Sequence, residues 1–329
     1  MFNPGLKGHL PIRQRLLDRL EAGRLPGSLL FAGPQGIGKR RAALELPQRE
    51  LCLRRCACGV CEGCRLFDSD PLPVELPNLL RIAPEGKAGL IRIGAIRDDD
   101  LVEGGVIRWA HHAPPPGCHR WILVEDAHRL NSFSANILLK TLEEPPPGTR
   151  FILVTHRPEA VLQTIRSRCE RIAFQALGAA DLAQVAEKAG WEPSELGPWL
   201  ALSGGTLRYL EPAAFHRARA QAEAWMALLA GRPFAEAAGP LLPDKDSSLA
   251  QSEQVGQCLE LLLLVLLDAA RMREGQPIRL EPWHSTLAKL AASPLDLKVP
   301  QGVVFEAMRN LARNPAAESL LRSVAASFR

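Results

Sequence analysis

Residues 33–40 constrain the fold of this chain more than any other stretch. They read Gly-Pro-Gln-Gly-Ile-Gly-Lys-Arg and lie between the apolar run Leu29–Ala32 and a segment with a helical pattern. A short buried strand, a Gly-rich turn and a helix start form the context that a phosphate-binding loop (P-loop) requires. Three glycines would let backbone N–H groups approach an anion at the helix N-terminus: Gly33, Gly36 and Gly38. We therefore expect a P-loop in which Lys39 reaches the terminal phosphates of ATP, the alternative being a Gly-rich turn without a ligand.

Position 40 departs from the P-loop motif. The motif ends in Ser or Thr, whose hydroxyl binds Mg²⁺, whereas Arg40 carries a permanent positive charge and no oxygen. The loop should keep its fold while Mg²⁺ binding is weakened. ATP could then bind weakly or without being hydrolysed.

The cysteines are clustered directly after the helix that the P-loop begins. Of the eight cysteines, five lie between residues 52 and 64; four of them form the pattern Cys52-x5-Cys58-x2-Cys61-x2-Cys64, and Cys56 is the extra thiol. Two consecutive C-x2-C steps are typical of a zinc site, and a shell of four thiolates is typical of a structural ion. The fourth ligand could be Cys52 or Cys56; we favour Cys52, because Cys56 and Cys58 are close in sequence. Buried thiols or a redox pair are the alternatives.

A second part of the expected nucleotide site follows the apolar strand Trp121–Val124. This strand ends in Glu125 and Asp126. In P-loop NTPases, carboxylates near the P-loop hold Mg²⁺ and polarise the attacking water. Their usual order is Asp then Glu, so the reversed pair is a second departure in the same site. The alternative is a solvated strand end with no ligand.

Apolar runs alternate with helical patterns through the first half of the chain, which predicts an α/β fold with a doubly wound parallel sheet. The other expected strands are Leu79–Ile82, Ile91–Ile93, Phe151–Thr155 and Arg171–Phe174. Helices are expected over Ile96–Val102 and Asn131–Glu144. After Leu177 the strand pattern ends and helical patterns continue. We therefore expect three domains: 1–175 with the cysteine insertion at about 52–64, a small helical domain at 176–212, and a longer all-helical domain at 213–329.

Composition and length are those of an ordinary globular protein. The chain has 329 residues, 47% hydrophobic residues and a net charge of +4, which does not by itself indicate a nucleic-acid-binding surface. The apolar stretch Leu261–Leu267 is too short to span a membrane. The N-terminus lacks a secretory pattern, so a cytoplasmic protein is expected.

The order and spacing of several motifs resemble the bacterial clamp-loader family, the AAA+ subunits of the DNA polymerase III holoenzyme. The motifs are Asn136–Pro146, Phe151–Thr155 and Ser167-Arg168-Cys169, together with the four-cysteine insertion. The resemblance covers essentially the whole chain and is weakest after residue 210. It implies an AAA+ P-loop domain, a small helical lid domain, and an all-α C-terminal collar domain that holds a ring of subunits together.

Within that family, the residues at positions 40, 125 and 126 resemble those of delta prime subunits rather than of ATPase subunits. The resemblance implies a subunit without independent catalysis. It would assemble with gamma/tau ATPase and delta subunits and help load the sliding clamp on primer-template DNA during replication. No membrane partner is implied.

The resemblance also implies roles for single residues. Arg168 matches an arginine finger, which would act in trans on ATP bound by a neighbouring subunit; otherwise it is an ordinary surface arginine. Thr155 matches the sensor 1 position, and Arg208 is a weaker match to sensor 2. The zinc ligands of the family match four cysteines, with a shorter first spacing than is usual: Cys52, Cys58, Cys61 and Cys64.

Two other functions are compatible with these patterns. The chain could be an active gamma/tau-like ATPase, with Glu125 and Asp126 in exchanged roles and water in place of the missing hydroxyl. It could instead be a zinc-dependent DNA-binding module outside any clamp loader. The modest net charge and the lack of a basic aromatic stripe argue against this last alternative.

Overall fold

The computed structural model describes residues 7–69, 71–84, 91, 105–244, 251–294, 297–311 and 316–328. These residues form two compact units. The first comprises Met1–Gln184 with Gly205–Leu207, and the second Val185–Gly204 with Arg208–Arg329. The predicted division into three domains stays a prediction.

The first unit is built on a six-stranded sheet with the order β2-β3-β4-β5-β1-β6. The strands are β1 (Ser28–Ala32), β2 (Glu75–Leu76), β3 (Leu79–Ile82), β4 (Arg120–Val124), β5 (Thr149–Thr155) and β6 (Glu170–Ala173). Every neighbouring pair is parallel except β2 and β3. The predicted parallel sheet is therefore confirmed. The antiparallel edge strand β2 was not predicted, because two residues are too few to show a periodicity.

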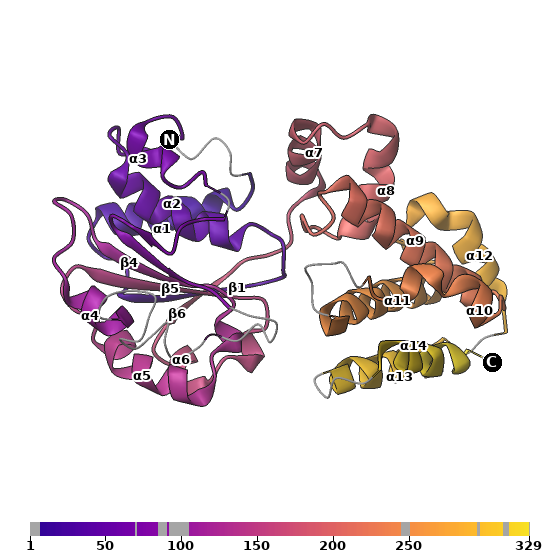
Figure 1. Cartoon of the computed structure of the whole chain (residues 1–329). Helices are drawn as coiled ribbons and strands as arrows, with labels where there is room; N and C mark the ends of the chain where they lie inside the picture. Colours follow the sequence, from indigo (N-terminus) through magenta and orange to yellow (C-terminus); the bar gives the residue numbers. More distant parts are fainter. Residues whose placement is uncertain are drawn as a thin grey trace. The chain divides into compact units, whose positions relative to one another are not determined.

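Helices cover both faces of this sheet (Figure 1). The helices on one face are α1 (Leu10–Glu21), α2 (Lys39–Leu51) and the short α3 (Glu62–Arg65); those on the other are α4 (Gly105–His111), α5 (Ser132–Glu143) and α6 (Gln163–Arg166). Because both faces are covered, the central strands are continuously apolar rather than alternating. All five residues of β1 are buried.

Local chemistry fixes where α5 begins and ends. The side chain of Asn131 accepts a hydrogen bond from the Ser134 backbone N–H at 2.8 Å and so caps the helix N-terminus. At the other end, Pro145 disfavours a helical conformation of the residue before it. Both boundaries agree with the predicted helix to within one residue.

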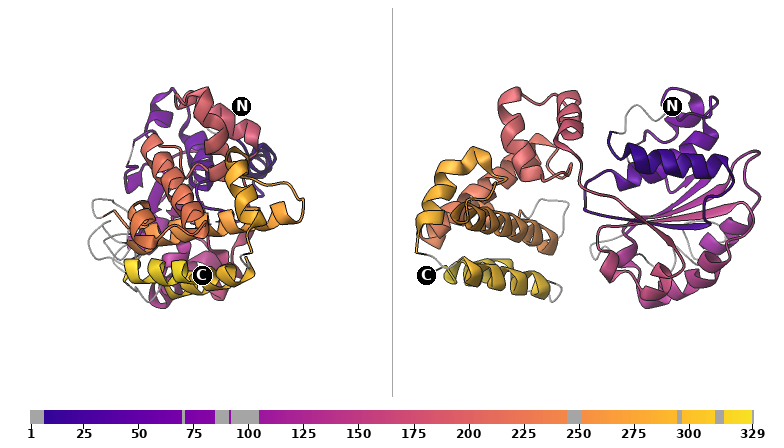
Figure 2. Two further views of the ribbon diagram at one scale, coloured as in Figure 1. Left: turned by 90° about the vertical axis from the view of Figure 1, so that its right-hand side faces the viewer. Right: turned by 180° about the vertical axis from the view of Figure 1, so that it is seen from behind.

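The second unit is helical, as the sequence predicts (Figure 2). The helices from residue 179 onward are α7 (Ala179–Lys188), α8 (Pro193–Ser203), α9 (Pro212–Leu229), α10 (Phe234–Ala237), α11 (Gln251–Arg273), α12 (His284–Ala292), α13 (Lys298–Asn310) and α14 (Ala317–Ala326). Short 3₁₀ helices occur in both units. The first unit contains η2 (Ala127–Arg129) and η3 (Pro158–Ala160), and the helical second unit contains η4 (Gly239–Leu241) and η5 (Glu281–Trp283). Large side chains fill the core of the second unit: Trp199, Phe215 and Trp225 are fully buried.

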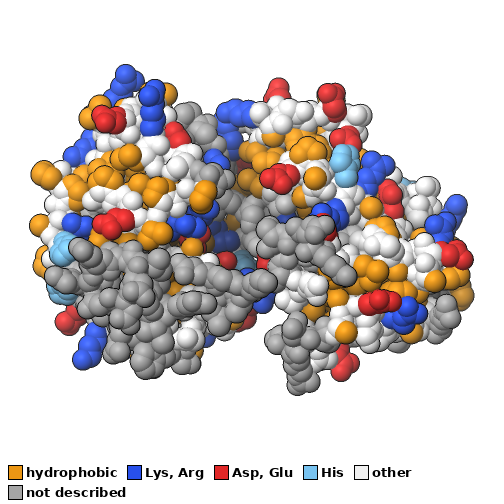
Figure 3. Space-filling model, viewed as in Figure 1, with side chains coloured by type: hydrophobic (Ala, Val, Ile, Leu, Met, Phe, Trp, Pro, Cys, Tyr) orange, Lys and Arg blue, Asp and Glu red, His pale blue; other side chains and the backbone are white. Residues whose placement is uncertain are grey.

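Two predicted elements lie outside the described residues. They are the helix over Ile96–Val102 and most of the strand Ile91–Ile93. Only Ile91 of that strand is described, and it forms an isolated parallel bridge with Leu130. Among the helices that the structure describes, none is long and apolar enough to cross a membrane. Basic and acidic side chains are interspersed on the face shown in Figure 3, in keeping with the small net charge of +4.

Candidate nucleotide-binding and metal sites

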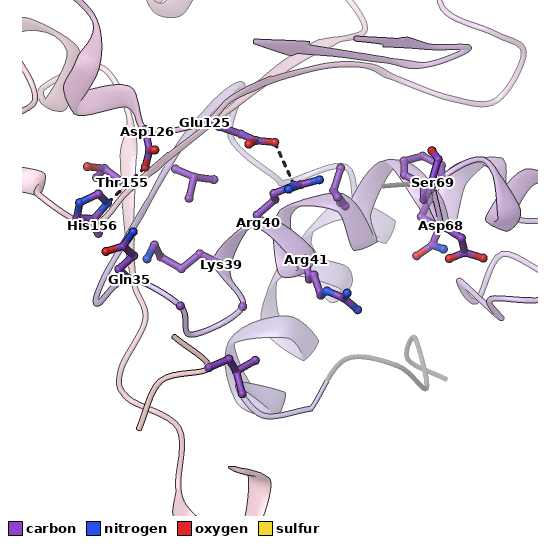
Figure 4. Close-up of a pocket in the computed structure, with 17 residues that line it drawn as sticks. Gln35, Lys39, Arg40, Arg41, Asp68, Ser69, Glu125, Asp126, Thr155 and His156 are labelled. Carbon is purple, nitrogen blue, oxygen red and sulfur yellow. Dashed lines mark ion pairs between the residues drawn. The ribbon is translucent and has the colours of Figure 1, made fainter. Parts of the chain in front are cut away.

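The Gly-rich loop joins β1 to α2, in the strand, turn and helix context that the sequence predicts. Gly36 and Gly38 have positive φ angles of 72° and 89°, a conformation that favours glycine. A side chain at Gly33 would lie 2.2 Å from the carbonyl oxygen of Phe174, so a close approach of two backbones also requires glycine there. The loop and the first turns of α2 line a cavity of about 470 Å³, which Figure 4 shows with its lining side chains.

Lys39 lies in this cavity but contacts the loop itself. Its Nζ donates hydrogen bonds to the carbonyl oxygens of Gly33 at 2.8 Å and Pro34 at 2.5 Å. Burial lowers the pKa of the Lys39 ammonium from 10.5 to about 8, against the opposing effect of the Asp126 carboxylate. A phosphate ligand would therefore have to replace two carbonyl contacts of Lys39.

Arg40 is held by the first of the two acidic residues. Its Nε lies 3.1 Å from Oε1 of Glu125, the contact marked by a dashed line in Figure 4. Glu125 also accepts hydrogen bonds from Arg81 on β3, at 2.7 Å from Nε and 3.3 Å from Nη2. The Glu125 carboxylate thus faces two guanidinium groups. Arg81 was missed by the sequence analysis, because its nearness to Glu125 follows from the pairing of β3 with β4.

Asp126 lies in a different environment, between two histidines. Oδ1 of Asp126 is 3.3 Å from Nδ1 of His156, and Nδ1 of His128 is 3.1 Å from Oγ1 of Thr155. Burial acts to raise the pKa of Asp126, but the hydrogen bond from His156 and the neighbouring cationic groups outweigh it and lower that pKa. Burial, reinforced by His156, lowers the pKa of His128 to about 4. Thr155 is fully buried, and its hydroxyl also accepts the backbone N–H of Arg157 at 3.1 Å.

The cysteine insertion brings four thiols together. The Sγ atom of Cys52 lies 3.7 Å from that of Cys58 and 3.8 Å from that of Cys61, and Cys58 lies 3.9 Å from Cys64. In a tetrahedron of thiolates bound to Zn²⁺ at about 2.3 Å, the sulfur atoms are about 3.8 Å apart. The four thiols therefore fit a tetrahedral ion. Cys56 is not part of the group.

Two features of the insertion favour a metal site. Burial acts to raise the pKa of the Cys52 thiol, but backbone N–H groups outweigh it and lower that pKa to about 5, which favours the thiolate form that binds metals. A side chain at Gly63 would lie 2.1 Å from the carbonyl oxygen of Leu51, so glycine at this position lets the segment between Cys61 and Cys64 lie close to the end of α2. These four cysteines could hold a metal ion.

The two arginines expected to contact nucleotide are both engaged in ion pairs. Nε of Arg168, just after α6, donates to Glu143 of α5 at 2.9 Å, and Nη1 donates to the carbonyl oxygen of Thr164 at 3.1 Å. Arg168 is partly exposed, with 30% of its side chain accessible. In the second unit, Arg208 forms an ion pair with Glu260 of α11.

Comparison with known proteins decides the family. The family model described as DNA polymerase III, delta subunit, matches residues 9–178, which is half of the chain. This chain belongs to that family. The matched residues include all six strands of the sheet, the helices α1 to α6, the cysteine insertion and Arg168.

The relatives include both types of subunit considered in the sequence analysis. The DNA polymerase III subunit delta' of Pseudomonas aeruginosa is 37% identical over 182 residues, which cover 54% of this chain and 52% of that protein. The subunit delta' of Escherichia coli is 34% identical, over 48% of this chain and 45% of that protein. The subunit gamma/tau of Mycobacterium tuberculosis strain H37Rv is 36% identical, over 48% of this chain and 26% of that protein. The chain thus matches about half the length of its delta' relatives.

Sequence reasoning missed three residues of the site in this DNA polymerase III family member. They are Arg81, His128 and His156. The two histidines carry a weak sequence signal, because they follow Asp126 and Thr155 closely and therefore lie at the ends of neighbouring parallel strands. Arg81 carries no such signal.

Proposed function

We propose that this chain is the delta prime subunit of a bacterial, cytoplasmic clamp loader. It would assemble with gamma/tau ATPase subunits and a delta subunit and help place the sliding clamp on primer-template DNA. Membership of the DNA polymerase III family supports this role. One observation supports a non-hydrolysing subunit within it: the Glu125 carboxylate contacts the guanidinium groups of both Arg40 and Arg81.

The residues around Glu125 do not fit Mg²⁺. P-loop NTPases bind this ion through the hydroxyl of the P-loop Ser or Thr and through a carboxylate at a strand end. Arg40 supplies no oxygen, and its guanidinium lies beside the carboxylate that the ion would need. We therefore assign no hydrolytic step to this chain. ATP could still bind weakly through the backbone N–H groups of residues 33–38 and through Lys39.

The active role that we assign to the chain belongs to Arg168. In our proposal, its guanidinium leaves Glu143 and contacts the phosphoryl oxygens of ATP bound by a neighbouring gamma/tau subunit. A planar guanidinium stabilises the charge that spreads over these oxygens in the transition state. Arginine fingers accelerate hydrolysis by roughly 10³ to 10⁵ in systems where they have been dissected.

We also propose that the four-cysteine group holds a structural Zn²⁺. With all four positions taken by protein thiolates, such an ion has no open position for substrate and stabilises the fold of the insertion. The insertion needs such support, because Leu53 and Val60 are largely exposed and contribute little to a core.

The test compares ATP hydrolysis by three reconstituted loaders, containing the wild-type chain, Arg168→Ala or Arg166→Ala, beside the isolated chain. Arg166 is the matched control, because it is a neighbouring arginine on the same short segment. We expect the isolated chain to be inactive, and Arg168→Ala to lower DNA-stimulated hydrolysis by the assembly while Arg166→Ala has little effect. Hydrolysis by the isolated chain would overturn the proposal. So would a loader in which Arg168→Ala and Arg166→Ala behave alike.

A further inference from the structure

Asp126, His128 and His156 form a compact group of potential metal ligands that the proposed function does not use. One ligand atom from each of the three residues lies within 4.8 Å of the other two. The His128 and His156 rings are 4.3 Å apart, centre to centre, at an angle of 76°. All three side chains are half-buried. The group lies in the first unit, and its ligands differ from those of the cysteine cluster.

Two segments that follow neighbouring strands bring these residues together. Asp126 follows β4 and adopts a left-handed conformation with a φ of 47°, which aspartate adopts more often than most residues other than glycine. His128 lies in the 3₁₀ helix η2, and His156 directly follows β5. Figure 4 shows Asp126 and His156 close together beside Thr155.

The chemistry of these ligands points to a particular class of ion. Two imidazoles and one carboxylate suit Zn²⁺ and other divalent transition metals, whereas Mg²⁺ prefers ligand oxygens. We propose that Asp126, His128 and His156 bind a divalent transition-metal ion such as Zn²⁺, as a second metal site of this chain. This site does not depend on the clamp-loader role.

The surroundings of the group limit its affinity and leave one side open. Nε of Arg129 lies 3.8 Å from Oδ2 of Asp126, and the positive charges of Lys39 and Arg157 also act on the group. The positive charges of these side chains repel a metal cation and therefore lower the affinity of the group for it. On the other side, Asp126 and His156 line the cavity next to the P-loop, so water or a phosphate oxygen could complete the coordination shell.

The test counts metal ions per chain. The purified full chain is dialysed to equilibrium against Zn²⁺ and, separately, Co²⁺, and bound metal is measured by elemental analysis. The absorption of Co²⁺–thiolate bonds reports the cysteine cluster alone, so the ion without thiolate ligands is counted separately. The variants are His156→Asn and Asp126→Asn. His216→Gln is the matched control, because His216 also faces a carboxylate, that of Glu195 at 3.9 Å, but belongs to no three-ligand group among the described residues.

We expect one ion without thiolate ligands per wild-type chain and per His216→Gln chain. Each of the other two variants should lower the affinity for that ion by at least about 10- to 100-fold, because losing a ligand costs no less than losing a residue that orients one. The thiolate absorption should remain, which also shows that the variants are folded. A wild-type chain that binds no such ion would overturn the proposal. The same conclusion follows if His156→Asn and Asp126→Asn bind it as tightly as the wild type, or if His216→Gln loses it.

Discussion

Nε of Arg40 lies 3.1 Å from Oε1 of Glu125, so the residue that departs from the P-loop motif contacts the residue that departs from the strand-end motif. The two departures are therefore physically connected. A guanidinium takes the place beside the carboxylate where a P-loop enzyme would hold a metal ion. We expect each residue alone to weaken Mg²⁺ binding, and Arg81 places a second guanidinium 2.7 Å from the same oxygen of Glu125.

Arg40→Thr should make nucleotide binding depend on Mg²⁺. The change removes a cation from Glu125 and adds the hydroxyl that the motif lacks. The ATP affinity measured with Mg²⁺, divided by the affinity measured with a chelator, should rise at least about tenfold, because the added hydroxyl is a metal ligand and even residues that orient ligands change metal affinity by about 10- to 100-fold. Calorimetric titration measures both affinities. Arg41→Thr is the matched control, because Arg41 points away from Glu125 in Figure 4; an equal response of the two variants would show that Arg40 does not block the ion.

Cys61→Ser should remove zinc from the insertion, whereas Cys56→Ser should not. Cys61 belongs to the four-thiol group and Cys56 lies outside it. We expect Cys61→Ser to weaken zinc binding by at least about 100-fold and to make the insertion sensitive to proteolysis, because structural zinc contributes directly to folding. Competition with a chromophoric chelator measures the affinity. If Cys56→Ser loses zinc instead, Cys56 is a zinc ligand and the ligand set Cys52, Cys58, Cys61 and Cys64 is wrong.

The buried ammonium of Lys39 should make the stability of the protein rise between about pH 8 and 10.5. Burial lowers the pKa of Lys39 from 10.5 to about 8 in the folded state, so in this range the unfolded chain binds more protons than the folded chain. Stability then rises with pH, by about 1–2 kcal/mol after allowance for solvent screening. Urea unfolding at several pH values should show this rise in the wild type relative to Lys39→Met. A constant difference between the two would contradict the shifted pKa.

Arg13 and Glu45 should be strongly coupled in their effect on the stability of the first unit. They join α1 to α2 through two hydrogen bonds of 2.7 and 2.6 Å, and both side chains are almost fully buried. Arg13→Met alone would leave the Glu45 charge buried without its guanidinium, and we expect a loss of about 3–5 kcal/mol in the free energy of unfolding. Urea unfolding of Arg13→Met, Glu45→Leu and the double variant tests this. The double variant should be more stable than either single one; additive losses would refute the coupling.

Much of the first unit could be predicted from local sequence. The Gly-rich loop, the apolar runs of the parallel strands and the C-x2-C steps are all patterns within short segments, and the structure has them at the predicted positions. The grouping of cysteines was predictable for the same reason, because all of them lie close together in the chain. The choice between Cys52 and Cys56 depends in addition on how the chain turns between the ligands, which the spacing of cysteines does not determine.

What the sequence by itself determined was thus the P-loop, the strands and helices around it, and the residue types available for chemistry. The tertiary structure decided which of these residues meet. Arg81 contacts Glu125 because β3 pairs with β4, and His156 meets Asp126 because β4 pairs with β5. Lys39 likewise turned out to contact the loop carbonyls. The physical reason is that pattern and propensity act over a few residues, whereas ion pairs and ligand groups depend on the order of strands in the sheet, which joins residues far apart in the chain.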